Sequence, residues 1–121
     1  MAVKIYGIKN CNTMKKTFQL FEKEGMDYEF VDYKKQAPTT DLLRGFLKKI
    51  TLDELVNRKG TTYKKLSENE KTTTSNIDTA IPILQEKSSM IKRPIIVFED
   101  GSVQAGFDED AILAKNRKYP G

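Results

Sequence analysis

Cys11 is the residue of this chain with the clearest chemical potential. It lies in the segment Asn10-Cys11-Asn12-Thr13, whose polar side chains are typical of the turn just before a helix. A helix N-terminus exposes unpaired N–H groups and a partial positive charge, which lower the pKa of a thiol by stabilising its thiolate. A cysteine that served only as a small core hydrophobe would lie on an apolar stripe instead. We therefore interpret Cys11 as a nucleophile.

The composition indicates how this nucleophile has to work. The chain of 121 residues has one cysteine and no histidine. These counts exclude an intramolecular disulfide, a Cys-rich zinc site, a Ser-His-Asp triad and a Cys-His dyad, and we expect neither a metal nor a bound cofactor. Met14 occupies the position at which a C-x-x-C oxidoreductase carries its second cysteine. Any redox turnover therefore needs an external thiol.

The hydrophobic patterning predicts the elements that position Cys11. Alternating or continuous apolar runs indicate strands, and apolar residues three or four positions apart indicate helices. The strands are predicted at residues 3–6, 28–33, 95–98 and 103–106, and two helices at residues 14–24 and 108–113. Asp100-Gly101 is a typical hairpin turn between the last two strands. Cys11 thus falls at the turn from the first strand to the first helix.

The segment between the second and third strands is predicted to be helical. Short helices are indicated at residues 42–47, 52–55 and 77–87, with polar connections at 57–62 and 71–75. Pro82 is expected to kink the last of these helices or to delay its start. The order β-α-β, a helical insertion at about 39–90, then β-β-α predicts an α/β, thioredoxin-like fold with a mixed four-stranded sheet. We expect one domain over residues 1–121.

Two arginines are candidates to assist the thiolate. Arg93 precedes Pro94 at the beginning of the third strand, and in the thioredoxin topology this proline is usually cis and faces the cysteine turn. A planar guanidinium there could pair with the thiolate or with an anionic substrate. Arg58 lies in the polar loop at 57–62 and is a weaker candidate when this loop is considered alone.

Charge and hydropathy restrict the partners. The net charge is +4, from 21 basic and 17 acidic residues. The lysine pairs lack the interleaved aromatics and arginines of a nucleic-acid surface, so we do not expect nucleic-acid binding. No apolar run is long enough for a transmembrane helix, and the first residues lack the pattern of a signal peptide. We expect a cytoplasmic monomer, a compartment that suits a lone reduced thiol.

Four sequence motifs resemble those of a known family. Residues 6–16 (YGIKNCNTMKK) resemble the opening of the Yffb branch of the arsenate reductase (ArsC) family, which also includes the Spx regulators. Residues 57–66 (NRKGTTYKKL) resemble the middle loop of that branch, and residues 91–96 (IKRPII) with Gly106-Phe107 resemble its C-terminal part. The motifs occur in the expected order over nearly the whole chain. The resemblance implies a thioredoxin-like core with a helical insertion, in agreement with the predicted elements.

The resemblance also implies roles for individual residues. Cys11 matches the nucleophilic cysteine of the family, and Pro94 matches its cis-proline. Arg58 and Arg93 match two of the arginines that surround the oxyanion in the arsenate reductases of the family. The chain departs from those enzymes at two points, since Gly106 lies near the position of their third arginine and no histidine precedes the cysteine.

Together with the lone nucleophilic cysteine, the resemblance to the Yffb branch implies a glutathione-dependent thiol reductase or transferase, a thiol-dependent oxidoreductase with glutathione as co-substrate. Cys11, Arg58 and Arg93 are the predicted catalytic residues. The residues expected to bind glutathione or an oxyanion substrate are Asn12, Thr13, Arg58, Arg93 and Pro94. Three alternatives stay open. One is an arsenate reductase. Another is a Spx-like transcriptional regulator that binds RNA polymerase, although Met14 removes the usual C-x-x-C switch of such regulators. The third is a domain that has kept the fold and lost the chemistry.

Overall fold

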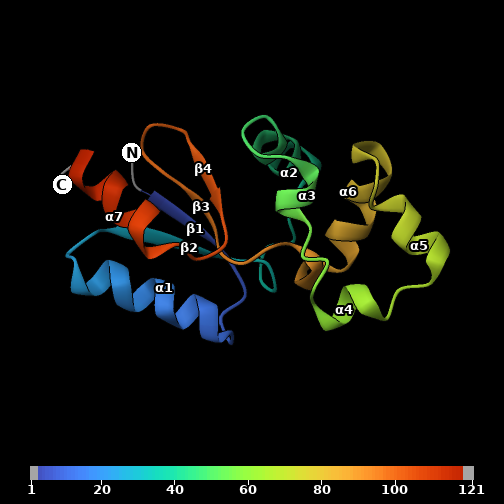
Figure 1. Ribbon diagram of the computed structural model, residues 1–121, viewed down its shortest axis with the longest axis horizontal. Helices are drawn as coiled ribbons and strands as arrows, with labels where there is room; N and C mark the ends of the chain where they lie inside the picture. The colour runs from blue at the N-terminus through green and yellow to red at the C-terminus, as the bar shows by residue number, and fades with distance from the viewer. Residues whose placement is uncertain (1–2, 119–121) are drawn as a thin grey trace. The chain divides into compact units, whose positions relative to one another are not determined.

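A mixed four-stranded sheet is built from the two ends of the chain (Figure 1). The computed structural model describes residues 3–118. The strands, in spatial order, are β2 (Tyr28–Asp32), β1 (Val3–Gly7), β3 (Ile95–Val97) and β4 (Val103–Ala105). β1 is parallel to β2, whereas β3 is antiparallel to both β1 and β4. The predicted mixed sheet and the hairpin that ends it are therefore confirmed.

Helices α1 (Asn12–Lys23) and α7 (Glu109–Lys118) complete this unit, which comprises Met1–Asp32 and Arg93–Gly121. Ile5 of β1 and Ile96 of β3 are opposite each other in register. Both are fully buried in one cluster with Phe21 of α1 and Ile112 of α7. Each such side chain contributes about 1.5–3 kcal/mol through its burial. The cluster therefore anchors α1, and with it the cysteine turn, to the central strand.

The C-terminal end of α1 is fixed by a glycine. Gly25 has a φ of +66°, a left-handed conformation that glycine adopts at little cost. The N–H of Gly25 donates to the carbonyl of Glu22, and that of Met26 donates to the carbonyl of Phe21. This pair of bonds is the Schellman motif, which satisfies the last carbonyls of a helix. The helix predicted at residues 14–24 therefore ends within one residue of the expected position.

Residues Tyr33–Lys92 form a second compact unit, which is helical. Its helices are α2 (Thr40–Leu47), α3 (Leu52–Leu55), α4 (Thr61–Lys64), α5 (Glu68–Thr73), α6 (Ile77–Glu86) and the 3-10 turn η1 (Ser88–Met90). An isolated antiparallel bridge joins Val56, directly after α3, to Ile91, directly after η1. The predicted insertion at 39–90 lies within this unit, and the single-domain interpretation stays a prediction.

The structure corrects one detail of the predicted insertion and decides between two alternatives for another. Part of the polar connection expected at 71–75 belongs to α5, because Ser67 and Glu70 form a reciprocal capping box that starts a helix at Glu68. Pro82 lies inside α6, which starts at Ile77 after the side chain of Asn76 caps it. The proline therefore does not delay the start of this helix.

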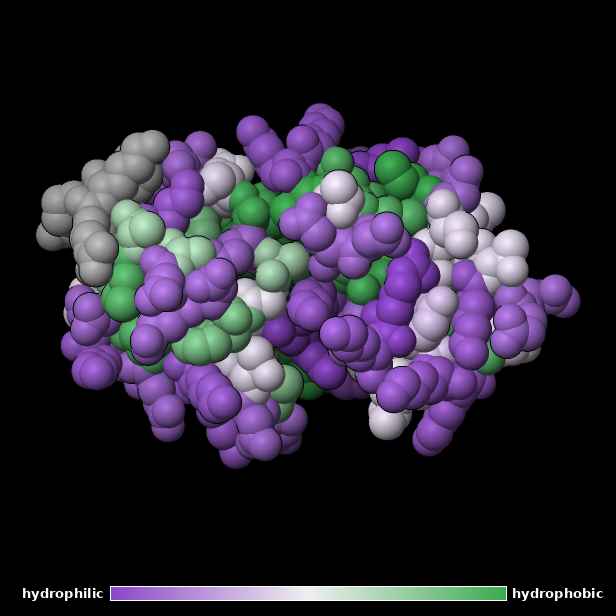
Figure 2. Space-filling view, in the orientation of Figure 1, coloured by the Kyte–Doolittle hydropathy of each residue, from purple (hydrophilic) through white to green (hydrophobic). Residues whose placement is uncertain are grey.

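The surface is rich in charged side chains. Hydrophilic residues cover much of the face in view (Figure 2), as the 31% of charged residues leads one to expect. Ile77, at 40% exposure, is a large hydrophobic residue on the surface. Between residues 3 and 118, no helix combines the length and the apolar character that crossing a membrane requires.

Candidate active site

Cys11 lies between the central strand and the first helix. β1 ends at Gly7, three residues follow, and Cys11 is the N-cap of α1 with an extended backbone (φ −144°, ψ 132°). Its carbonyl accepts the first helical bond, from the N–H of Lys15 at 3.0 Å. The side chain of Cys11 is half-buried, and it makes no capping hydrogen bond to α1. The predicted position of the cysteine at a strand-to-helix turn is confirmed.

The surroundings of Cys11 favour its thiolate. Partial burial, the largest single effect, raises the pKa of the Cys11 thiol. The backbone N–H groups of Met14 and Thr13, the charge of Arg93 and the hydroxyl of Thr13 act in the opposite direction and together lower the pKa below its ordinary value. A lower pKa gives more thiolate at neutral pH, and the thiolate is the form that attacks. Backbone dipoles and an arginine thus act here where many cysteine enzymes use an imidazole.

Arg93 lies close enough to act on Cys11 by its charge because of strand register. Tyr6 of β1 is opposite Ile95 of β3, so the two residues before Ile95 lie beside the end of β1, where the loop to Cys11 begins. The Arg93-Pro94 peptide bond is cis, as expected from the resemblance, and Pro94 is buried. The structure therefore brings Cys11, Arg93 and Pro94 to one end of the sheet within a single unit.

Asn12 and Thr13, the predicted binding residues next to the cysteine, form the first turn of α1. Asn12 is exposed and Thr13 is half-buried. The carbonyl of Thr13 accepts a hydrogen bond of 2.8 Å from the hydroxyl of the fully buried Thr17, which holds this turn in place. No acidic residue occurs in the turn. Its N–H groups therefore face Cys11 and any anion there without a competing carboxylate on the same turn.

Arg58 belongs to the helical unit, where its side chain has several partners. One terminal nitrogen donates to the hydroxyl of Thr74 at 2.8 Å and to that of Tyr63 at 3.4 Å. The other donates to the carbonyl of Thr74 at 3.1 Å and to the carboxylate of Asp53 at 3.0 Å. The guanidinium also lies over the ring of Tyr63. These bonds give Arg58 a structural role, and its predicted catalytic role stays a prediction.

Gly106 follows β4 and bonds to the turn that carries Arg93. Its N–H donates to the carbonyl of Pro94 at 2.8 Å, and its φ is +87°. The carbonyl of Gly106 accepts a bond of 3.1 Å from the side-chain amide of Gln104. We did not identify Gln104 from the sequence. The feature of the sequence that could have indicated Gln104 is the hairpin at Asp100-Gly101. This hairpin sets the strand register, which brings residues 94 and 106 opposite each other.

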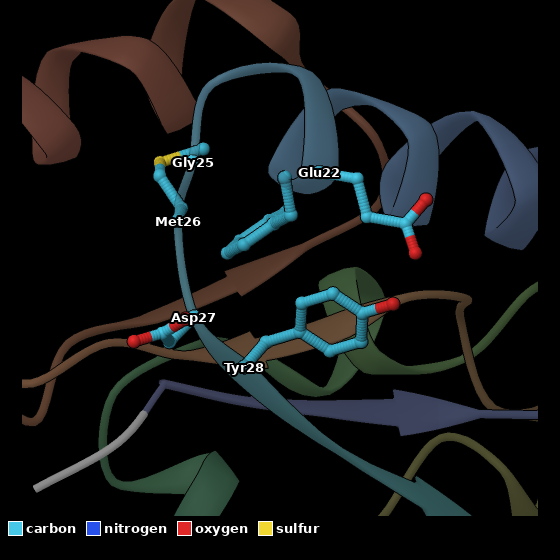
Figure 3. A pocket seen from close by; sticks show the side chains of 6 residues that line it. Glu22, Gly25, Met26, Asp27 and Tyr28 are labelled. Atoms are coloured by element: carbon cyan, nitrogen blue, oxygen red, sulfur yellow. The ribbon is translucent and has the colours of Figure 1, made fainter.

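A shallow hollow lies at the other end of α1 (Figure 3). It is lined by Phe21, Glu22, Gly25, Met26, Asp27 and Tyr28. Ten helical residues separate Cys11 from Glu22, which is about 15 Å of helix, so the hollow is no part of the cysteine site. Over residues 3–118, no group of three or more metal-ligating side chains of the His, Cys, Asp and Glu types is found.

Comparisons with known proteins bear on the family and the fold of this chain. A model of the ArsC family matches residues 6–115. An uncharacterized protein of Haemophilus influenzae is 34% identical over 112 residues, covering 93% of this chain and 96% of that protein. The solved structure of a YffB protein is 34% identical with a TM-score of 0.87, covering 94% of this chain and 98% of that one. That of an arsenate reductase (ArsC) related protein from Brucella melitensis is 40% identical with a TM-score of 0.73, covering 94% and 93%. The thioredoxin-like fold is confirmed.

Proposed function

Because this chain belongs to the ArsC family, we propose that it is a glutathione-dependent thiol reductase or transferase with Cys11 as its nucleophile. The observation that carries the proposal is the location of Cys11 at the N-terminus of α1 beside Arg93, where its pKa is lowered. Reactive cysteines occupy electropositive, partly exposed positions of this kind, whereas structural cysteines are buried and inert. Cys11 is half-buried, so a small disulfide can approach its sulfur.

The proposed reaction is a pair of thiol–disulfide exchanges. The Cys11 thiolate attacks the glutathione sulfur of a mixed disulfide, the S–S bond breaks, and the substrate leaves as a thiolate. The product is a disulfide between Cys11 and glutathione. A second glutathione thiolate then attacks this disulfide, forms oxidised glutathione and releases Cys11 as a thiolate. The sum of the two exchanges converts one mixed disulfide and one glutathione into the substrate thiol and oxidised glutathione, and the chain itself ends unchanged.

The residues around Cys11 have distinct parts in this reaction. The N–H groups of Thr13 and Met14 stabilise the Cys11 thiolate both as nucleophile and as leaving group. The charge of Arg93 does the same and also attracts the carboxylates of glutathione. Because Met14 replaces a second cysteine, the mixed disulfide has to wait for an external thiol. We place the reaction in the cytoplasm, where the glutathione pool is kept reduced.

Mass spectrometry of the intact protein tests the proposal. Brief incubation with oxidised glutathione should add one glutathionyl group to Cys11, and Arg93→Ala should slow this about threefold to tenfold because less thiolate is present. Arg44→Ala is the matched control, since Arg44 is exposed and pairs with Asp78 in the helical unit. Absence of an adduct on Cys11, or an equally fast reaction in Arg93→Ala, would contradict the proposal.

Arsenate reduction is the second candidate, favoured by the name of the Brucella melitensis relative. Gly106 is the observation against it. At a φ of +87° an arginine would be strained, and the N–H of Gly106 is already bonded to Pro94. The site therefore offers no third arginine at this position. Thiol oxidation measured with and without arsenate separates the two functions, and robust arsenate-dependent turnover would favour the second.

A further inference from the structure

The β3–β4 ladder contains a carbonyl group that the backbone leaves without a donor. Ile96 and Gln104 are opposite each other, and the N–H of Phe98 donates to the carbonyl of Ser102. At the other end of the ladder, the N–H of Gly106 donates to the carbonyl of Pro94 at 2.8 Å. In a hydrogen-bonded antiparallel pair the opposite residue returns a bond. Pro94 has no N–H, so the carbonyl of Gly106 lacks its ladder donor.

The side chain of Gln104 supplies the missing donor. Its amide Nε2 donates to the carbonyl of Gly106 at 3.1 Å in a partly buried position. Gly106 itself is buried, where a polar group without a partner is costly. Gln104 is therefore connected to Arg93 through two hydrogen bonds and a peptide bond. The side chain of Gln104 donates to Gly106, Gly106 donates to Pro94, and Pro94 directly follows Arg93.

We propose that Gln104 is a positioning residue, which holds Arg93 beside Cys11 by completing the hydrogen bonds of the Arg93-Pro94 turn. The inference rests on the proposed function, in which the charge of Arg93 stabilises the thiolate. The interaction between two charges weakens with distance, and it weakens further where water enters. If the hydrogen bond from Gln104 to Gly106 is lost, the backbone of Arg93 can shift, and the distance between its guanidinium and Cys11 changes. Gln104 acts on Cys11 through this backbone and touches no reacting atom.

The test compares the alkylation rate of Cys11 by iodoacetamide at neutral pH in four variants. Gln104→Met keeps the length of the side chain and removes the amide donor. Arg93→Ala removes the charge, and the double variant combines both changes. Gln85→Met is the matched control, because the amide of Gln85 also donates to a proline carbonyl at 3.1 Å, that of Pro38 in the helical unit.

Gln104→Met should slow alkylation about twofold to fivefold, because a displaced Arg93 stabilises less thiolate. Gln85→Met should leave the rate at the wild-type value. In the Arg93→Ala background the Gln104 substitution should have no further effect, since both act through one charge. An unchanged rate in Gln104→Met beside a slowed Arg93→Ala would overturn the inference and leave the proposed function standing. An unchanged rate in Arg93→Ala would remove the electrostatic part of the proposed function, and the inference with it.

A measurement on the wild-type chain keeps the inference testable if Gln104→Met folds poorly. The side-chain amide protons of Gln104 should exchange with solvent more slowly than those of Gln19 and Gln36, which are exposed. NMR spectroscopy resolves these signals individually. Exchange of the Gln104 amide as fast as that of Gln19 would mean that the bond to Gly106 does not hold in solution, and the inference would be wrong.

Discussion

The sulfur of Met14 lies so close to Gly7 that a Cβ atom at position 7 would be 2.6 Å from it. Met14 is fully buried, and Gly7 is the last residue of the central strand. The thioether therefore fills the space above the strand end from which the loop to Cys11 departs. The residue that replaces a second cysteine is thus also a packing element of the site.

Substitution of Gly7 by alanine should destabilise the fold. The added methyl group has to displace Met14 inside the core, and such overpacking costs about 1–3 kcal/mol. Gly45→Ala in α2 is the control, because nothing lies within 4 Å of a Cβ there and the change should stabilise the exposed helix by about 1 kcal/mol. Urea denaturation measures both free energies of unfolding. Equal effects at the two positions would contradict the close Gly7–Met14 contact.

Replacement of Met14 by cysteine should create an internal redox couple. Cys11 and the new thiol would form a C-x-x-C motif at a helix N-terminus, the arrangement of dithiol oxidoreductases. After treatment with oxidised glutathione, Met14→Cys should lose two hydrogen atoms in mass and carry no adduct, whereas Met14→Ser should keep the glutathionyl group. A persistent adduct on Met14→Cys would show that the first turn of α1 does not bring the two sulfurs together.

Arg58 should contribute more to stability than an ordinary surface arginine. Its terminal nitrogens bind the hydroxyl and the carbonyl of Thr74, which is fully buried. Removal of a partner from buried polar groups costs about 1–3 kcal/mol, whereas an exposed ion pair such as that of Arg44 contributes about 0–1 kcal/mol. Arg58→Ala and Arg44→Ala, compared by thermal denaturation, should differ accordingly.

The alkylation rate of Cys11 in Arg58→Ala decides the predicted catalytic role of Arg58. A structural arginine should lower the melting temperature and leave this rate unchanged in the folded protein. A slower rate with little loss of stability would instead support the role that the family resemblance implies.

Asp100 makes stability depend on acid pH. The side chain and the N–H of Ser102 and the ammonium of Lys115 hold the pKa of the Asp100 carboxyl well below its usual range. Because the folded pKa is the lower one, the carboxylate stabilises the fold above the unfolded value of about 4, and this stabilisation is lost as the pH falls below it. The melting temperatures of wild type and Asp100→Asn should therefore converge under acid conditions, with Glu99→Gln as the control for charge removal. A constant difference would contradict the Ser102 and Lys115 contacts.

The sheet and the position of the cysteine were predictable because their signals are local. Alternation in β1 and β2, the apolar run of β3 and the Asp100-Gly101 turn each identify an element within a few residues. α5 was missed because its polar composition suggested a connection. The capping pair of Ser67 and Glu70 was visible in the sequence and outweighs that composition.

The side-chain partners were predictable only in part. The register that places Arg93 near Cys11 follows from the topology, and the family resemblance suggested the cis-proline. The partners of Arg58 lie 5 to 16 residues away, on short helices or, for Thr74, directly after one, so no periodic pattern relates them. The bond from Gln104 depends on a strand register and on the missing N–H of Pro94, and neither is visible at position 104 itself.

The pKa of Cys11, measured by pH-dependent alkylation, tests the central claim most directly. The same thiol in the urea-denatured chain is the internal reference, with a value expected near the ordinary value of about 8.5. We expect a lower pKa in the folded protein, because the N–H groups of Met14 and Thr13, the hydroxyl of Thr13 and the charge of Arg93 outweigh partial burial. A folded pKa equal to or above that of the denatured chain would mean that the thiol is not activated, and the proposed chemistry would be wrong.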